Sequence, residues 1–214
     1  MTQDYSDQTK FFDPQTWIEP IHLIGAGGIC NMLGITLSKM GITQEIHVWD
    51  DDELETRNCP TEVAYSYQMV GQPKVVAMAD SVRYVMGDVN NIIQHHERIT
   101  IDSDLSGVVI SGVDSMASRK IIWDCVQQHF LEIPLYIDGR SGGLITQIFA
   151  LSPADYDQCE NYANWLFDDE DAMPLECGAR NYPPAALYFA YAISNLLAKW
   201  HRGEDIKFYT KAIL

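Results

Sequence analysis

The sequence lacks the features of several classes of protein. No apolar run approaches the ~18 residues of a membrane span, and residues 1–20 show no signal-peptide pattern. We therefore expect a soluble, cytoplasmic protein with no membrane partner. Basic residues are scarce, with 14 Lys and Arg against 30 Asp and Glu and a formal net charge of −16 at pH 7. Because such a chain repels phosphates, we do not expect nucleic acid as a partner.

Paired cysteines are also missing. The chain has five cysteines, an odd number, and no two of them form a C-x-x-C pair. They lie far apart, at Cys30, Cys59, Cys125, Cys159 and Cys177. Neither a disulfide framework nor a four-cysteine zinc site is indicated, and we predict no zinc.

The length of 214 residues suits one domain, and a hydrophobic content of 47% is sufficient for a core. Residues 1–19 would form a polar and aromatic N-terminal arm, and 155–182 an acidic, irregular crossover-type loop. Between them, strands and helices alternate, which predicts an α/β fold with a Rossmann-like, doubly wound, mainly parallel sheet. We expect helices at 29–39, 73–86, 115–129 and 183–200. We expect strands at 21–24, 46–49, 107–113, 135–138, 144–151 and 206–212, the last two as antiparallel edge strands, a turn at 139–143 and a further strand near 98–101.

The segment at 21–52 is the most informative part of the chain. It consists of a short apolar strand, the glycine turn GAGG at 25–28, a helix and a second strand that ends on Asp50. Such a βαβ unit is typical of nucleotide sites, because glycines let the backbone approach a phosphate and the helix N-terminus offers free N–H groups. The G-x-G-x-x-G pattern is incomplete, since Cys30 occupies the third position. A packing turn with solvated acids and a nicotinamide-dependent oxidoreductase are the alternatives for this unit.

Chemically distinctive residues follow the glycine turn in a fixed order. They are Asp50 and Asp52 at the strand end, Asn58, VGQPK with Lys74, and Asp114 at the end of a later strand, before Arg119. This ordered set resembles the ThiF/MoeB/HesA family, which includes the adenylation domain of ubiquitin-activating enzymes. The match covers about 21–138, with weaker agreement over 176–200, and the chain is identified as a short, atypical member.

The resemblance implies a doubly wound fold with an eight-stranded core, usually as a homodimer. It also implies ATP- and Mg²⁺-dependent adenylation of the C-terminal glycine of a ubiquitin-like or sulfur-carrier protein. By matching position, the glycines of the turn would cradle phosphates, and Asp50 would hold the ribose. Asn58 and Lys74 would contact the triphosphate, and Asp114 would bind Mg²⁺. The nucleotide-binding set is therefore Gly25, Gly27, Gly28, Asp50, Asp52, Asn58 and Lys74.

Two departures from the family pattern favour an alternative. In the family motif N-x-x-R-Q, this chain has Thr61 in place of the arginine and Glu62 in place of the glutamine. A guanidinium that would clamp phosphates is absent, although Arg57 could substitute for it. The arm at 1–19 also contains no arginine, whereas family members often extend one to the partner subunit's site. The alternative is a catalytically degenerate scaffold that binds nucleotide or a ubiquitin-like protein.

Several candidate residues also have a simpler interpretation. Lys74 could be a surface residue at a helix start, Asp114 a helix cap, and Asn58 a turn residue. Cys177 matches the location where some family members carry a reactive cysteine and is therefore a candidate catalytic residue, although a lone cysteine is more often inert. For Arg119 we favour a structural ion pair.

Overall fold

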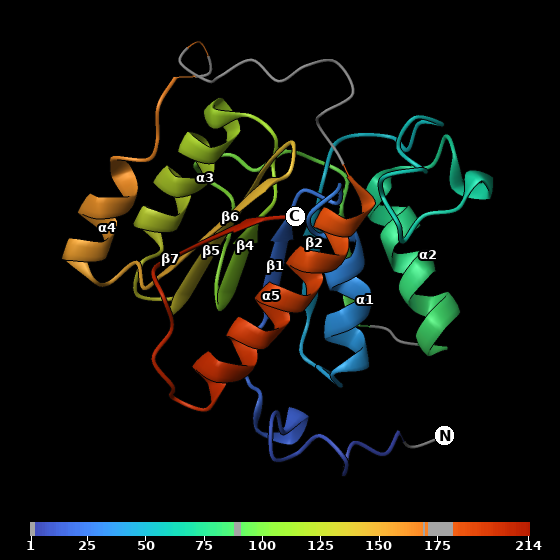
Figure 1. Cartoon of the computed structure of the whole chain (residues 1–214), viewed down its shortest axis with the longest axis horizontal. Coiled ribbons are helices and arrows are strands. Elements are labelled where there is room, and N and C mark those ends of the chain that lie inside the picture. The colour runs from blue at the N-terminus through green and yellow to red at the C-terminus, as the bar shows by residue number, and fades with distance from the viewer. Residues whose placement is uncertain (1–2, 88–90, 169, 171–181) are drawn as a thin grey trace.

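The computed structural model describes residues 3–87, 91–168, 170 and 182–214. Their core is one seven-stranded sheet in the order β3-β2-β1-β4-β5-β6-β7 (Figure 1). The strands are β1 (Ile21–Ile24), β2 (Ile46–Trp49), β3 (Ile92–His95), β4 (Val108–Ser111), β5 (Leu135–Gly142), β6 (Ile145–Leu151) and β7 (Tyr209–Ile213). Neighbours from β3 to β5 pair in parallel, and β5, β6 and β7 pair antiparallel. This arrangement confirms the expected α/β, mainly parallel, Rossmann-like fold.

Helices cover both faces of the sheet. They are α1 (Asn31–Lys39), α2 (Lys74–Met86), α3 (Met116–Gln128), α4 (Tyr156–Ala163) and α5 (Pro183–His201), with short 3₁₀ turns at η1 (Pro14–Thr16) and η2 (Tyr67–Met69). Helix α1 packs between α2 and α5 on one face, and α3 and α4 lie on the other (Figure 1). None of the helices in the described residues combines the length and hydropathy that a membrane crossing requires.

Burial on both faces explains why the central strands are continuous apolar runs. In β4, Val108 and Ile110 pack into the core beneath α1, while Val109 packs into the core on the side of α3. All of these side chains are fully buried, as expected of a central parallel strand. Three predicted boundaries are also confirmed. The first two strands end at 24 and 49, and the second helix ends at 86.

The prediction of a strand near 98–101 was wrong. The third strand is β3, which pairs in register with β2 from Ile92 onward. It is a short edge strand, and only the first of its four residues, Ile92, is buried, so its apolar signal is too short to stand out. Its last residue, His95, stacks on Trp49 with ring centroids 3.7 Å apart, and aromatic stacking across the strand pair stabilises the edge.

The C-terminal half differs from expectation in three places. The segment expected to be irregular contains α4, which starts after Asp155, whose side chain accepts from the N–H of Gln158. Strand β5 continues through the turn expected at 139–143, because it pairs with β6 as far as Gly142. Strand β6 is not an edge strand, since β7 lies beside it. The eighth strand that the resemblance implied is not present in the described ranges.

The N-terminal arm is docked through aromatic rings. The ring of Trp17 lies 5.9 Å from that of Trp200 and 5.3 Å from that of His201, near the end of α5. Phe12 and Trp17 are both buried. The ring of Tyr5 covers Gly41, where an added Cβ would meet it at 2.6 Å. The arm therefore packs against the ends of α1 and α5, and lies at the foot of the molecule in Figure 1.

Candidate functional site

Three loops meet where the strand order of the sheet reverses. Strand β1 lies between β2 and β4 and is parallel to both, so the segments after Ile24, Trp49 and Ser111 leave the sheet at the same edge. In open α/β sheets this is the edge where ligands bind. The glycine turn, Asp50 and Asp114 are therefore neighbouring features of one edge.

The glycine turn follows β1 directly. Gly25 has a φ of +91°, and a Cβ at this position would lie 3.1 Å from the carbonyl oxygen of Gly112. Both the left-handed backbone and the close approach of β4 require glycine here. Helix α1 then begins at Asn31, and its N-cap residue Cys30 makes no side-chain cap bond. The helix start therefore keeps donor groups and a partial positive charge that suit an anion.

Asp50 ties the tip of β2 to this turn. Its Oδ2 accepts from the N–H of Ala26 at 2.7 Å, and its Oδ1 accepts from the N–H of Asp52 at 2.8 Å. Burial raises the pKa of Asp50, while Lys74 and these two N–H donors oppose the rise. A carboxylate oxygen can accept more than one hydrogen bond, so the predicted role of Asp50 toward ribose hydroxyls is compatible with these contacts.

Lys74 is the first residue of α2 and is only 8% exposed, so it is not a surface lysine. Its Nζ lies 3.0 Å from Asp52 Oδ2 and 3.8 Å from Glu62 Oε1. Burial lowers the pKa of Lys74, but the carboxylates of Glu62, Asp50 and Asp52 outweigh burial and raise it. Lys74 is therefore a fixed ammonium among three acids.

Glu62, the acid in place of the family's glutamine, lies inside the site. It is 2% exposed, and its Oε1 is the nearest atom to a Cβ added at Gly27, at 3.5 Å. Burial raises its pKa to about 7 against the pull of Lys74. Its Oε2 has no hydrogen-bond partner within the described part of the chain.

Two side chains clamp the segment around Glu62 onto the glycine turn. Asn31 Nδ2 donates to the carbonyl oxygen of Gly27 at 2.8 Å, and its Oδ1 accepts from the N–H of Ala64 at 3.1 Å. The hydroxyl of Tyr65 donates to the carbonyl oxygen of Ala26. Sequence reasoning missed both residues; the one signal was a polar Asn31 at the start of a helix whose buried side is mostly apolar.

Asn58 forms the turn that carries these residues. Its Oδ1 accepts from the N–H of Glu55 at 2.8 Å, and its carbonyl oxygen accepts from the N–H groups of Thr61 and Glu62. This geometry supports the interpretation of Asn58 as a turn residue. Thr61 lines a small hollow, with a volume of only about 10 Å³, together with Gly28, Ile29, Ser141, Tyr182, Ala185 and Phe189.

Asp114 follows β4 and is exposed. It does not cap α3, because the N-cap is Ser115, whose Oγ accepts from the N–H of Ser118 at 3.1 Å. The helix-cap interpretation of Asp114 was therefore wrong. Asp114 lies close enough to Arg98 to raise its pKa, although Arg98 pairs directly with Asp51.

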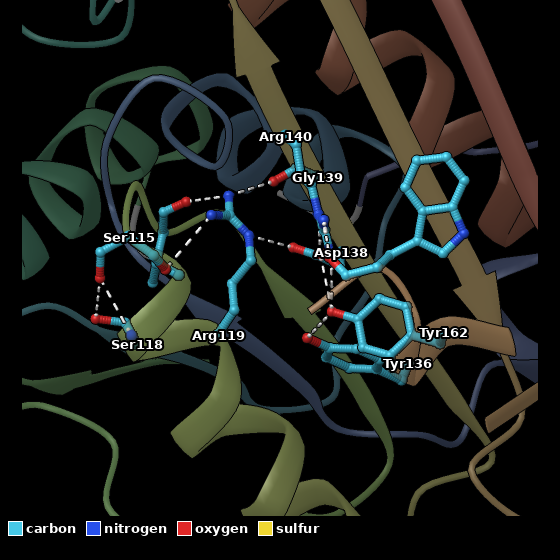
Figure 2. A network of polar contacts seen from close by, with 10 residues as sticks. Ser115, Ser118, Arg119, Tyr136, Asp138, Gly139, Arg140 and Tyr162 are labelled. Carbon is cyan, nitrogen blue, oxygen red and sulfur yellow. Dashed lines mark hydrogen bonds and ion pairs between the residues drawn. The ribbon is translucent and has the colours of Figure 1, made fainter. Parts of the chain in front are cut away.

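Arg119 holds the loop that carries Asp114. This buried side chain donates to the carbonyl oxygens of Val113, Ser115 and Gly139 (Figure 2). Its Nε lies 3.1 Å from Asp138 Oδ1, so the expected structural ion pair is confirmed. Through Arg119, helix α3 thus fixes the carboxyl end of β4 against β5.

Asp138 is the centre of a second network, which sequence reasoning missed. Its Oδ2 accepts from Arg140 Nε at 2.6 Å and from the hydroxyl of Tyr162 at 2.9 Å (Figure 2). Arg140 also donates to the carbonyl oxygen of Trp165 and lies over the ring of Phe149. Together these contacts fasten α4 and the segment after it to the sheet.

The acids at the end of β2 form a group close enough to share an ion. Oxygen atoms of Asp50, Asp51 and Asp52 lie within 4.8 Å of one another, and no other such trio occurs in the described residues. Each acid already has protein partners, since Asp51 pairs with Arg98 and Asp52 with Lys74. Asp114 lies outside this trio, and its role as the cation ligand stays a prediction.

The candidate cysteine lies outside the described residues, because Cys177 falls within 171–181. Of the other four, Cys30, Cys59 and Cys125 are buried, Cys159 is half-buried, and all four are free thiols. Burial raises the pKa of Cys30, Cys125 and Cys159. These three thiols therefore lack the lowered pKa that a reactive cysteine has.

The sequence matches the ThiF family over residues 19–207. It is 26% identical over 133 residues to the adenylyltransferase and sulfurtransferase MOCS3-1 of Zea mays, covering 60% of this chain and 27% of that protein. It is 24% identical over 173 residues to the NEDD8-activating enzyme E1 catalytic subunit of Saccharomyces cerevisiae, covering 76% of this chain and 57% of that protein. The chain therefore spans between about a quarter and just over half of the length of these relatives.

Solved structures share the fold at low identity. A crystal structure of PaaA superposes with a TM-score of 0.69 at 17% identity, over 99% of this chain and 75% of that chain. The E. coli MccB structure with AMPCPP and MccA superposes with a TM-score of 0.71 at 14% identity, over 98% and 70%. At these identities the likeness shows the fold alone.

Proposed function

The chain belongs to the ThiF family, and we propose that it uses ATP to adenylate the C-terminus of a ubiquitin-like or sulfur-carrier protein. One observation carries this proposal. The glycine turn, Asp50 and Lys74 occupy one edge of the sheet and are joined by short contacts, from Ala26 N to Asp50 and from Asp52 to Lys74. The names of the maize and yeast relatives, an adenylyltransferase and an E1 subunit, support the same reaction class.

In the proposed reaction, a carboxylate oxygen of the carrier's C-terminus attacks the α-phosphorus of ATP. A new oxygen–phosphorus bond gives the acyl adenylate, while the bond to the bridging oxygen breaks and pyrophosphate leaves with both electrons. Two anions must approach each other, so the site has to supply positive charge. Lys74 and the start of α1 supply it on the protein side.

The exposed carboxylate of Asp114 suits a hard cation, and we assign it to Mg²⁺. When bound, the ion neutralises charge on the phosphates. Arg119 keeps the Asp114 loop in place through three backbone carbonyl groups. In our proposal, Asp50 orients the ribose and the glycine turn carries the phosphates.

The proposal includes assembly as a homodimer in the cytoplasm. Helix α5 supports a dimer face, because Leu187 is 49% exposed and Tyr191, four residues later on the same side of the helix, is 67% exposed. Contiguous exposed apolar side chains mark protein contacts, so we assign this side of α5 to the dimer.

Pyrophosphate exchange into ATP tests the adenylation step. With a carrier that ends in two glycines, Lys74→Ala should lower the exchange rate by roughly 10²–10³, which is typical when one charge-stabilising group is removed. Lys39→Ala is the matched control, since Lys39 is an exposed helix lysine at the far end of α1. Equal exchange by both variants would contradict the role of Lys74.

The second candidate function is a scaffold that binds nucleotide without chemistry. It is favoured by Thr61 at the position of the family arginine and by the ion pair that already neutralises Lys74. Nucleotide binding without exchange, for every carrier tried, would support this scaffold function. Carrier adenylate detected by mass spectrometry would exclude it.

A further inference from the structure

Glu62 has no role in the mechanism proposed above, yet its position is specific. One oxygen of its carboxyl group lies against the glycine turn, with Oε1 3.5 Å from a Cβ added at Gly27. The same oxygen is 3.8 Å from Lys74 Nζ, which is too long for a direct hydrogen bond. Oε2 is buried and has no partner in the described ranges. A buried polar atom without a partner costs free energy, and a ligand atom that paired with it would remove that cost.

The groups that face Glu62 come from three elements. Helix α2 contributes Lys74, the end of β2 contributes Asp50 and Asp52, and its own segment contributes Tyr65. Lys74 is shared, and its shortest contact is with Asp52 rather than with Glu62. Burial and the two aspartates therefore outweigh the ammonium, and the pKa of Glu62 rises to about 7. Near neutral pH, Glu62 is present in both its protonated and its ionised form.

The two forms would treat a phosphate in opposite ways. An ionised Glu62 would place a negative charge against the phosphate oxygens, in a site where water does not screen it. A protonated Glu62 is neutral and carries an O–H donor. The remaining donors of the glycine turn favour an anion at the same place.

We infer that Glu62 is a binding residue for the nucleotide phosphates: its carboxyl group is protonated when a phosphate occupies the glycine turn, and it donates a hydrogen bond to that phosphate. The inference rests on the proposed binding of ATP. It means that nucleotide binding takes up a proton and weakens as the pH rises.

Glu62→Gln tests the inference, because the amide keeps a donor at this position and cannot ionise. Affinity for a non-hydrolysable ATP analogue with Mg²⁺ is measured by calorimetry between pH 6 and 8.5. In the unaltered protein the dissociation constant should rise roughly tenfold between pH 7 and 8.5, as for one proton taken up by a group with a pKa of about 7. For Glu62→Gln it should stay nearly constant. Glu53→Gln is the matched control, since Glu53 is exposed and its change of charge is the same.

The outcomes separate this inference from the proposed function. Equal pH dependence in the unaltered protein and in Glu62→Gln would overturn the inference while leaving ATP binding in place. No binding by either protein at any pH would overturn both. Should Glu62→Gln fail to fold, proton uptake by the unaltered protein decides the matter, measured at pH 7.5 in buffers of different ionisation enthalpy. Net uptake on nucleotide binding supports the inference, and no uptake contradicts it.

Discussion

The protein buries two groups of charged side chains, and the ratio of acidic to basic side chains is opposite in the two. Around Asp138, a single carboxylate meets the guanidinium groups of Arg119 and Arg140. Around Lys74, a single ammonium faces the carboxylates of Asp50, Asp52 and Glu62. Both groups lie at or next to the carboxyl ends of parallel strands, yet only the second adjoins the glycine turn.

The two groups also differ in how completely they are hydrogen-bonded. Both oxygens of Asp138 accept hydrogen bonds, and Arg119 also donates to three backbone carbonyl oxygens. In the Lys74 group, Glu62 Oε2 is left without a partner in the described residues. A fully hydrogen-bonded network makes a structure rigid, whereas an incomplete one can be completed by a ligand. We therefore assign stability to the Asp138 group and ligand binding to the Lys74 group.

Asp138→Asn should have the largest effect. It leaves two buried guanidinium groups without a counter-charge and should lower the free energy of unfolding by about 3–5 kcal/mol. Urea denaturation measures this change. Asp124→Asn is the control, because Asp124 is exposed on α3 and should change stability by less than about 0.5 kcal/mol. Similar losses in both variants would remove the contrast between the two groups.

Glu62→Gln should change stability in the opposite direction, and only at high pH. Because its folded-state pKa is raised from 4.5 to about 7, the native state keeps the proton longer than the unfolded chain as the pH rises. The free energy of unfolding therefore falls progressively as the pH rises from about 4.5 to about 7, and it stays lower above pH 7. At pH 8, Glu62→Gln should be more stable than the unaltered protein by up to about 3 kcal/mol.

The same denaturation experiment at pH 4.5 provides the check on Glu62. There the glutamate is protonated in the native state, so the two proteins should differ little. A gain in stability that is equal at pH 4.5 and pH 8 would point to packing rather than to charge.

Thr61→Arg should have the smallest effect, and it tests the shortage of cations in the Lys74 group. A guanidinium at this position, at the hollow beside Gly28, would add a charge-assisted contact to phosphate worth about 1.5–3 kcal/mol. Affinity for ATP should therefore rise about tenfold or more in a fluorescence titration. Thr61→Met, which is similar in length but uncharged, should leave the affinity unchanged. An equal gain with methionine would show that size, not charge, limits binding.

Much of the fold could be predicted from local patterns. Strands with two buried faces, such as β1 and β4, are continuous apolar runs, and α2 starts where Pro73 suits a helix beginning. Strand β3 escaped prediction because it is short and part of its contact with β2 is a stack between Trp49 and His95. Such a contact depends on strand register, and no local pattern carries it.

The site was predictable where its residues follow strand ends, and not where they come from loops. Asp50 and Lys74 were expected together, and the structure joins them through Asp52. In the sequence, Glu62 showed only that the glutamine of the family motif is replaced. Its burial could not be predicted, because it depends on contacts that Asn31 and Tyr65 make with distant backbone groups. The direction of a pKa shift follows from those contacts and cannot be read from the sequence position.

The docking of the arm has a consequence for how the chain is made. Trp17 packs against Trp200, and 183 positions separate them in the sequence. A ribosome adding 5–20 residues per second needs roughly 10–35 s to synthesise that interval. During this time Phe12 and Trp17 have no hydrophobic partner on α5 and are available to chaperones. Phe12 and Trp17 thus reach their native contacts on α5 only after that interval has been synthesised.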